Sequence, residues 1–152
     1  MEIKKSKYFK IQEFVPKKTY EELGETAWKL ISPRWIDIMD SIQELFGDKK
    51  VVINNWDKPV IGYRDFQFRG IRTKDSKEYN PNSQHCKIPL ECSDFNVVGL
   101  NAHQVACKIM ENGVKLHAMG VRRTESAKDA PTWTHLDCKE TGKKTIHIFN
   151  AK

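Results

Sequence analysis

The sequence has little cysteine, and none of it is arranged in closely spaced pairs. The 152 residues include four cysteines, Cys86, Cys92, Cys107 and Cys138, and no Cys-x-x-Cys pair. This pattern excludes a disulfide-scaffolded fold and the zinc modules that are built from paired cysteines. A structural zinc site made of Cys86, Cys92 and nearby His85 is conceivable, but its spacing matches no common zinc module.

Long apolar runs are also missing. No segment approaches the roughly 18 consecutive apolar residues of a membrane helix, so we expect no membrane-spanning segment and no membrane partner. Residues 1–10 are basic but lack the apolar core of a secretory signal peptide. We therefore expect reduced cysteines. The chain shows no internal repeat, low-complexity segment or linker, and its length favours a single domain over residues 1–152.

Charged residues are abundant, and positively charged ones are in modest excess. The 26 lysines and arginines outnumber the 20 aspartates and glutamates, which gives a net charge of +6. A charge of this size is explained by solubility, although it also suits attraction to an anionic polymer such as nucleic acid or bacterial cell wall. Because no aromatic-interleaved basic strand or recognition helix is present, we expect no nucleic-acid partner.

Three segments carry the end signals of helices. We expect helices over 19–31, opened by Thr19 as a cap, from Ser32 to Gly47, and from Asn101 to Gly113. In the second of these, apolar residues recur at helical spacing and predict the face that packs into the core. That face comprises Trp35, Ile38, Met39, Ile42, Leu45 and Phe46.

Strand patterns follow the second and third helices. We expect strands over 50–56, 114–121, 132–138 and 144–149, and an irregular loop over 57–100 whose length predicts a functional role. Of the histidines outside the motifs below, we expect His103 to be exposed on a helix, and His117 and His147 to be structural residues of strands. The order of elements predicts an α+β fold with a small antiparallel sheet flanked by helices.

Chemistry-bearing residues gather in three short motifs. They are the segment from Arg69 to Arg72, the run Ser83-Gln84-His85 followed by Asp94, and the strand segment from Trp133 to Asp137. Alternation along a strand places Trp133, His135 and Asp137 on one face. Two histidines and one carboxylate are a sufficient ligand set for catalytic zinc, which keeps one position open for water. Such triples also occur as buried, satisfied histidines beside surface acids, so the residues by themselves leave both interpretations open.

These motifs resemble the zinc D-alanyl-D-alanine peptidase family, which includes VanX-like dipeptidases, phage endolysin peptidases and hedgehog-like domains. The family pattern is Ser-x-His, then Asp, and much later a strand with a final His. Gly70-Ile71-Arg72 is similar to the family's Gly-x-Arg segment, and the opening run from Tyr8 to Phe14 is similar to its usual start. The resemblance extends over about residues 8–138.

The resemblance implies a hedgehog/DD-peptidase-like fold and assigns roles to individual residues. It makes His85, Asp94 and His135 the zinc ligands, and Arg72 the cation that stabilises the oxyanion of the reaction. The residues expected to contact substrate are Ser83, Trp133 and Tyr63.

The sequence departs from the family pattern in two places. The segment between His85 and Asp94 is two residues longer than usual. Many members carry an acid three positions before the final histidine, where this chain has Thr132, which cannot act as a base. Glu125, in a segment similar to that of phage-type members, and Asp137 are the candidate substitutes. We favour Glu125, because Asp137 can instead orient a metal-ligating histidine.

The implied function is a monomeric zinc metallopeptidase, a D,D- or L,D-type carboxypeptidase or endopeptidase that hydrolyses peptidoglycan stem peptides. The expected location is the cytoplasm, or the cell wall after release by a phage holin-type route. The alternative is a non-catalytic, hedgehog-like zinc domain that binds a cell-wall polymer or a protein partner.

Overall fold

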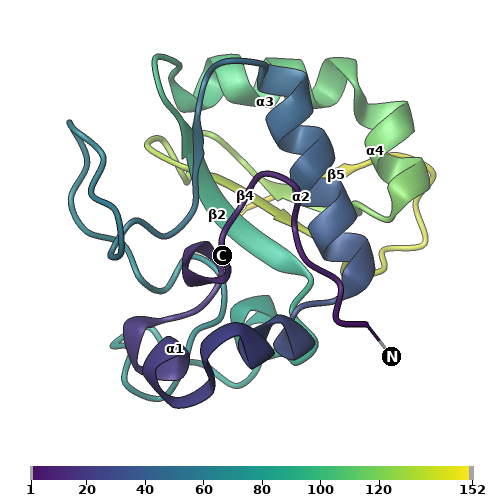
Figure 1. Cartoon of the computed structure of the whole chain (residues 1–152). Coiled ribbons are helices and arrows are strands. Elements are labelled where there is room, and N and C mark those ends of the chain that lie inside the picture. The colour runs from purple at the N-terminus through teal and green to yellow at the C-terminus, as the bar shows by residue number, and fades with distance from the viewer. Residues whose placement is uncertain (1, 151–152) are drawn as a thin grey trace.

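The computed structural model describes residues 2–150 and has an α+β architecture with a mixed five-stranded sheet (Figure 1). The sheet order is β1-β2-β4-β3-β5. The strands are β1 (Val51–Val52), β2 (Cys92–Val97), β3 (Arg123–Glu125), β4 (Thr134–Asp137) and β5 (His147–Phe149). The α+β class is therefore confirmed. The prediction of an antiparallel sheet is wrong at one edge, because β3 and β5 pair in parallel.

The helices are η1 (Ile11–Glu13), α1 (Lys17–Leu23), η2 (Gly24–Leu30), α2 (Pro33–Phe46), η3 (Gln84–Cys86), α3 (Ala102–Glu111) and α4 (Gly113–Met119). Two of the three predicted helices, α2 and α3, agree with the sequence signals at both ends. The predicted helix over 19–31 is wrong as one element. It begins earlier, with Thr19 inside α1, and it breaks at Gly24, whose φ of +55° ends the α-helix before a 3-10 segment continues the chain.

Two predictions of strand and loop are also wrong. Residues 114–121, predicted as a strand, form most of α4, so His117 lies on a helix rather than a strand. Within this segment Leu116 is buried while Val114 is 89% exposed, which a short apolar run cannot reveal. The predicted loop 57–100 contains β2, whose polar residues alternate with buried ones.

The two faces of the sheet have different partners. Helix α2 packs across one face, where the Trp35 indole Nε1 donates a 3.0 Å hydrogen bond to Ser93 Oγ of β2. The apolar stripe of α2 is buried there as predicted, with Trp35, Ile38, Met39 and Ile42 fully covered. Side chains alternate along β2, so its neighbour Asp94 projects from the opposite face. That second face carries the candidate site.

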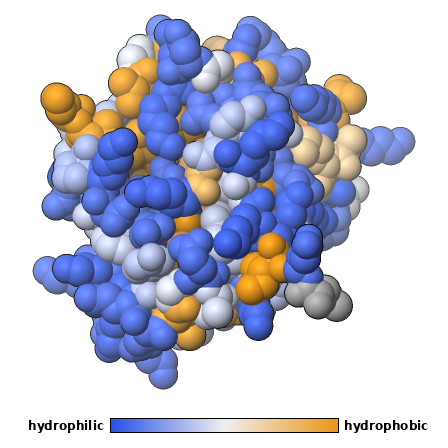
Figure 2. All heavy atoms as spheres, in the orientation of Figure 1, coloured by the Kyte–Doolittle hydropathy of each residue, from blue (hydrophilic) through white to orange (hydrophobic). Residues whose placement is uncertain are grey.

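The surface is mostly hydrophilic on the face that Figure 2 shows, with hydrophobic residues in separate small groups. One exposed apolar position is Ile61, in the long segment between β1 and η3. Within residues 2–150, no helix has the length and apolar character needed to cross a membrane.

Candidate metal centre

Strand pairing brings two of the predicted ligands together at the centre of the sheet. In the antiparallel pair of β2 and β4, Asp94 lies opposite His135. The His135 Nδ1 atom lies 2.8 Å from Asp94 Oδ1. Both side chains are largely shielded from solvent, with exposed fractions of 14% for Asp94 and 9% for His135. The strand register alone therefore accounts for a carboxylate–imidazole pair between residues 41 positions apart.

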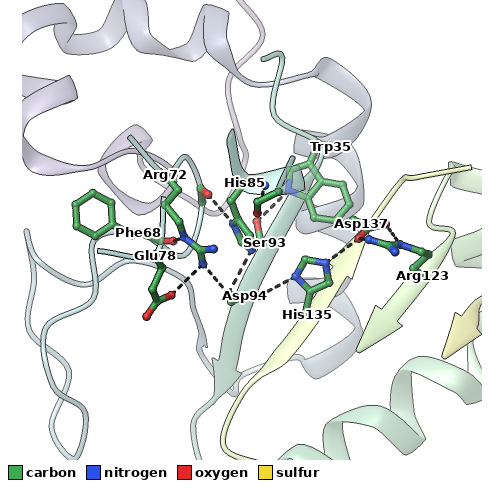
Figure 3. Close-up of polar contacts among 12 residues, drawn as sticks. Trp35, Phe68, Arg72, Glu78, His85, Ser93, Asp94, Arg123, His135 and Asp137 are labelled. Atoms are coloured by element: carbon green, nitrogen blue, oxygen red, sulfur yellow. Dashed lines mark hydrogen bonds and ion pairs between the residues drawn. The ribbon is translucent and has the colours of Figure 1, made fainter. Parts of the chain in front are cut away.

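The third residue, His85, arrives from the 3-10 turn η3 rather than from the sheet. The Ser83 hydroxyl caps this turn by accepting a 3.2 Å hydrogen bond from the His85 backbone N–H. The His85 Nε2 atom lies 3.3 Å from Asp94 Oδ2, so Asp94 stands between the two histidines (Figure 3). Ser83, which we expected to contact substrate, thus has a defined role in positioning His85.

A close backbone approach at Gly70 fixes the other side of His85. The His85 Nδ1–H group donates a 2.8 Å hydrogen bond to the Gly70 carbonyl oxygen. A Cβ at position 70 would lie 2.2 Å from the carbonyl oxygen of Phe14, which is far inside van der Waals contact. Position 70 therefore requires glycine, and the sequence Gly70-Ile71-Arg72 serves packing as well as chemistry.

The tautomers that these contacts impose suit a metal ion. A carbonyl oxygen only accepts, so Gly70 holds the proton on Nδ1 of His85 and leaves Nε2 as the metal-facing nitrogen. His135 lies between two carboxylates: its Nε2–H group donates to Asp137 Oδ2 at 2.8 Å, and loss of the proton on Nδ1, which faces Asp94, would leave that nitrogen available to a metal. Metal-ligating histidines ordinarily have their second nitrogen held in this way. The ligand atoms of His85, Asp94 and His135 all lie within 4.8 Å of one another, so the cluster could hold a metal ion.

No cysteine joins this cluster among residues 2–150. Cys92 is fully buried in the core, and burial raises the pKa of its thiol well above the ordinary value. Burial also raises the pKa of the Cys138 thiol, to about 12. A buried thiol that keeps its proton is a poor metal ligand, and these observations give no support to a site made of Cys86, Cys92 and His85.

Asp137 lies behind His135 and is fully buried. It also accepts two hydrogen bonds from the Arg123 guanidinium, at 3.0 Å and 2.7 Å (Figure 3). Burial opposes the charged form, but hydrogen bonds from His135 and Arg123 outweigh it and lower the pKa of Asp137 to about 2. Asp137 is therefore an ionised, fully occupied carboxylate whose contacts fix the orientation of the His135 ring.

Replacing Asp137 by asparagine should weaken metal binding about 10–100-fold, the usual consequence of removing a partner that orients a ligating histidine. The ring of His135 would keep its place on β4 but lose the negatively charged acceptor that holds its Nε2 proton. A competition titration against a chromogenic chelator measures the affinity. Asp129→Asn, a change on the exposed surface, serves as the control. An unchanged metal affinity in Asp137→Asn would show that Asp137 does not support metal binding.

Metal affinity should also depend on pH through His135. Burial lowers the pKa of this imidazole, but hydrogen bonds to Asp137 and Asp94 outweigh burial and raise it to about 9. In the metal-free protein, charged His135 contributes stability that is fully present below about pH 6.5 and is lost as the pH rises through about 9. A metal ion must displace this proton, so affinity should rise by up to about tenfold per pH unit between pH 6.5 and 9. The same chelator titration at several pH values checks this, and a flat profile would contradict it.

Arg72 stands beside the cluster, at one wall of a cleft. Its guanidinium lies 3.4 Å from Asp94 Oδ2 and 3.7 Å from Glu78 Oε2, and its Nε donates to the Phe68 carbonyl oxygen at 3.3 Å (Figure 3). The cleft has a volume of about 330 Å³, and Arg72, Asp94 and Trp133 all line it. The arrangement presents a fixed, directional cation beside the Asp94 carboxylate.

Glu125 lies on the same sheet face as the cluster. Strand β3 pairs with β4 through Arg123 opposite Asp137, and continuing this antiparallel register places Glu125 opposite His135. Its side chain is half-buried, and burial raises the pKa of its carboxyl above the ordinary value although charged His135 and the Trp133 side chain lower it. Glu125 is thus a partly accessible carboxylate on the sheet face of the cluster, in contact with Trp133, which lines the cleft.

Two further expected residues lie along the same region. Trp133 lines the first cleft and also a second one of about 390 Å³, which Tyr63 lines as well. Sequence reasoning included Arg69 in the motif from Arg69 to Arg72 but gave it no role, and in the structure it lines both clefts. Sequence reasoning missed the carbonyl of Gly70 and the Arg123–Asp137 pair. A half-buried arginine inside a loop has no sequence signature beyond its proximity to the Gly-x-Arg segment.

Comparison of the chain with protein-family models, with curated proteins and with solved structures found no match.

Proposed function

We propose that this protein is a zinc-dependent peptidase with a hedgehog/DD-peptidase-like fold that hydrolyses peptidoglycan stem peptides. The observation that carries the proposal is the cluster of His85, Asp94 and His135 beside a cleft. In it, each histidine has one nitrogen directed at Asp94 and the other held by Gly70 or Asp137. A zinc ion bound there would supply Lewis-acid polarisation and water activation.

The other steps of the reaction are assigned to side chains of the protein. Arg72 offers guanidinium donors at the edge of the cleft, where they can hold the negative charge that develops on the peptide carbonyl oxygen. Glu125 accepts a proton from the attacking water and returns it to the leaving amine. Asp137 stays ionised and keeps the His135 ring oriented. Trp133 and Tyr63 provide aromatic walls against which a peptide can pack.

Two features favour Glu125 over Asp137 as the base. Glu125 is half-buried on the face of the cluster and contacts Trp133, a residue of the cleft wall, whereas Asp137 has no exposed surface. Asp137 also has its oxygens occupied by His135, Arg123 and the backbone N–H of Lys139. A general base must come within hydrogen-bond reach of the water that it deprotonates, which an enclosed carboxylate cannot do.

The choice of a peptidoglycan substrate rests on the sequence resemblance and on charge. The motifs around His85, Asp94 and His135 resemble those of wall-directed peptidases, and the net charge of +6 suits an anionic wall polymer. The test is digestion of purified peptidoglycan by the zinc-loaded protein, with mass spectrometry of the released peptides. We expect one type of bond to be cleaved, with activity lost on chelation and recovered with zinc. Intact peptidoglycan after incubation with zinc-loaded protein would contradict the proposal.

A non-catalytic zinc domain is the second candidate, and one observation favours it. Asp94 already pairs with both histidines and with Arg72, and among residues 2–150 no buried side-chain polar atom lacks a hydrogen-bond partner. A cluster whose polar atoms all have hydrogen-bond partners can have a purely structural role. Zinc binding and sedimentation with peptidoglycan, without any release of peptides, would favour this candidate over the peptidase.

A further inference from the structure

Two arginines stand apart from the rest in how their charge is balanced. Arg34, Arg72, Arg122 and Arg123 each form an ion pair with a carboxylate. Within the described chain, Arg64 and Arg69 have no carboxylate at ion-pair distance. Both lie on the ring of Phe66, with guanidinium carbons 5.4 Å and 3.5 Å from its centroid.

Arg69 has no carboxylate at ion-pair distance among residues 2–150, and the charge of Asp94, farther away, offsets only part of the cost of its burial. The side chain is half-buried, and its polar contact is a hydrogen bond to the neutral amide oxygen of Asn96. A guanidinium removed from water without an anionic partner is costly, and Arg64 beside the same ring adds repulsion between like charges. Phe66 offsets part of this cost through cation–π contact, but it supplies no counter-charge. The pair therefore presents guanidinium groups without a direct ion-pair partner to a cleft whose wall also carries Asp65, Glu78 and Asp94.

The position of this charge relative to the metal cluster is set by β2. The Asp94 backbone N–H donates a 2.8 Å hydrogen bond to the Arg69 carbonyl oxygen, so the segment of Arg69 lies against the strand. Asn96, the side-chain partner of Arg69, follows Asp94 by two residues on the same face. The strand rise separates these positions by about 7 Å, which matches about two residues of an extended peptide. Both arginines line the two adjoining clefts together with Trp133.

We propose that Arg69, assisted by Arg64, forms an anion subsite that binds a carboxylate of a peptide ligand one or two residues from the bond placed over the metal cluster. The planar fork of a guanidinium matches a carboxylate in two parallel hydrogen bonds. The identification of this ligand as a substrate rests on the proposed function. The subsite itself does not require hydrolysis. The carboxylate can come from a chain terminus or from an acidic side chain.

The experiment measures peptide binding to metal-free protein, so that neither turnover nor direct binding to a metal contributes. The probes are acetyl-dialanine with a free carboxylate, its C-terminal amide, and the amide of acetyl-Ala-Glu, each prepared from L- and from D-residues. Binding is followed by NMR titration of the Trp133 indole signal. The variants are Arg69→Gln and Arg64→Gln, with Lys74→Gln as a control that removes one exposed charge outside the two clefts.

We expect at least one carboxylate peptide to bind wild-type protein about tenfold or more tightly than the neutral amide, as expected for a hydrogen bond to a charged group. Arg69→Gln should bring this ratio close to one, Arg64→Gln should reduce it, and Lys74→Gln should keep it. Preference for the terminal carboxylate or for the glutamate peptide identifies the source of the anion.

Equal binding of acid and amide by the wild type would overturn the subsite, as would an absence of binding by every peptide. A preference that survives Arg69→Gln would overturn it too. If Arg69→Gln fails to fold, the ratio of acid to amide affinity in the wild type and in the Arg64→Gln variant, which changes an exposed residue, still tests the subsite. Failure of peptidoglycan hydrolysis alongside a retained carboxylate preference would refute the peptidase and leave the subsite standing.

Discussion

Replacing Glu125 by glutamine should reduce hydrolysis by about 100- to 10,000-fold while leaving the metal bound, the range expected when a general base is removed. The substitution keeps the shape of the side chain and removes only its capacity to accept a proton. Glu125 lies outside the ligand set of His85, Asp94 and His135, so zinc content should equal that of the wild type. Parallel measurement of turnover on peptidoglycan fragments and of zinc by atomic absorption separates the two effects.

Two other carboxylates serve as comparisons for Glu125. Glu78 lies on the cleft wall, where it pairs with Arg72, and Glu78→Gln should retain most activity. Asp137→Asn should lose zinc affinity together with activity. If Glu78→Gln or Asp137→Asn abolishes turnover with zinc retained while Glu125→Gln stays active, the base is misassigned. If none of the three changes turnover, the proposed mechanism is wrong.

Replacing Arg72 by lysine should also inactivate the protein with its fold and its metal intact. Removal of one donor that stabilises an oxyanion typically costs about 3–4 kcal/mol of transition-state energy, or about 100- to 1,000-fold in rate. Lysine keeps the charge but cannot contact Asp94 and the Phe68 carbonyl while presenting a second donor to the cleft. Thermal unfolding, zinc content and turnover are the three measurements.

Arg34→Lys is the matched control for Arg72→Lys. Arg34 forms an ion pair with Glu91 and does not line the cleft of Arg72. This variant should keep full turnover. A fully active Arg72→Lys protein would assign Arg72 to structural pairing with Asp94, and the oxyanion would need another stabilising group.

Sequence reasoning succeeded where a periodic pattern coincided with clear end signals. Helix α2 has Ser32 and Pro33 at its start and Gly47 at its end, where φ is +62°, and it matches the predicted element. The predicted capping box of α3 is present, because Asn101 and Gln104 exchange side-chain and backbone hydrogen bonds. In these places local chemistry and tertiary packing favour the same structure.

The failures lie where tertiary contacts override weak local signals. Strand β2 includes Ser93 and Asp94, polar residues whose local sequence is typical of a loop. Ser93 is stabilised in the strand by its hydrogen bond with Trp35, and Asp94 by its contacts with the two histidines. Strand β3 is polar because Arg123 and Glu125 face the site. Such partners are distant in sequence, so no local pattern predicts them.

The candidate site was partly predictable for a related reason. The spacing of residues on one strand predicted that His135 and Asp137 share a face, and they are hydrogen-bonded there. The approach of His85 to Asp94 came only from motif resemblance, since a turn and a strand meet there. The Gly70 carbonyl and the charge of Arg69 depend on backbone approach and burial, which a sequence does not display.

The central claim is that His85, Asp94 and His135 hold one metal ion, and zinc content tests it most directly. Protein purified in zinc-containing buffer and then desalted should carry about one zinc per chain, as expected for a single three-ligand site. His85→Ala, Asp94→Ala and His135→Ala should each lose it, whereas His103→Ala, which changes an exposed histidine of α3, should keep it. Equal zinc content in the wild type and in all three ligand variants would contradict the claim.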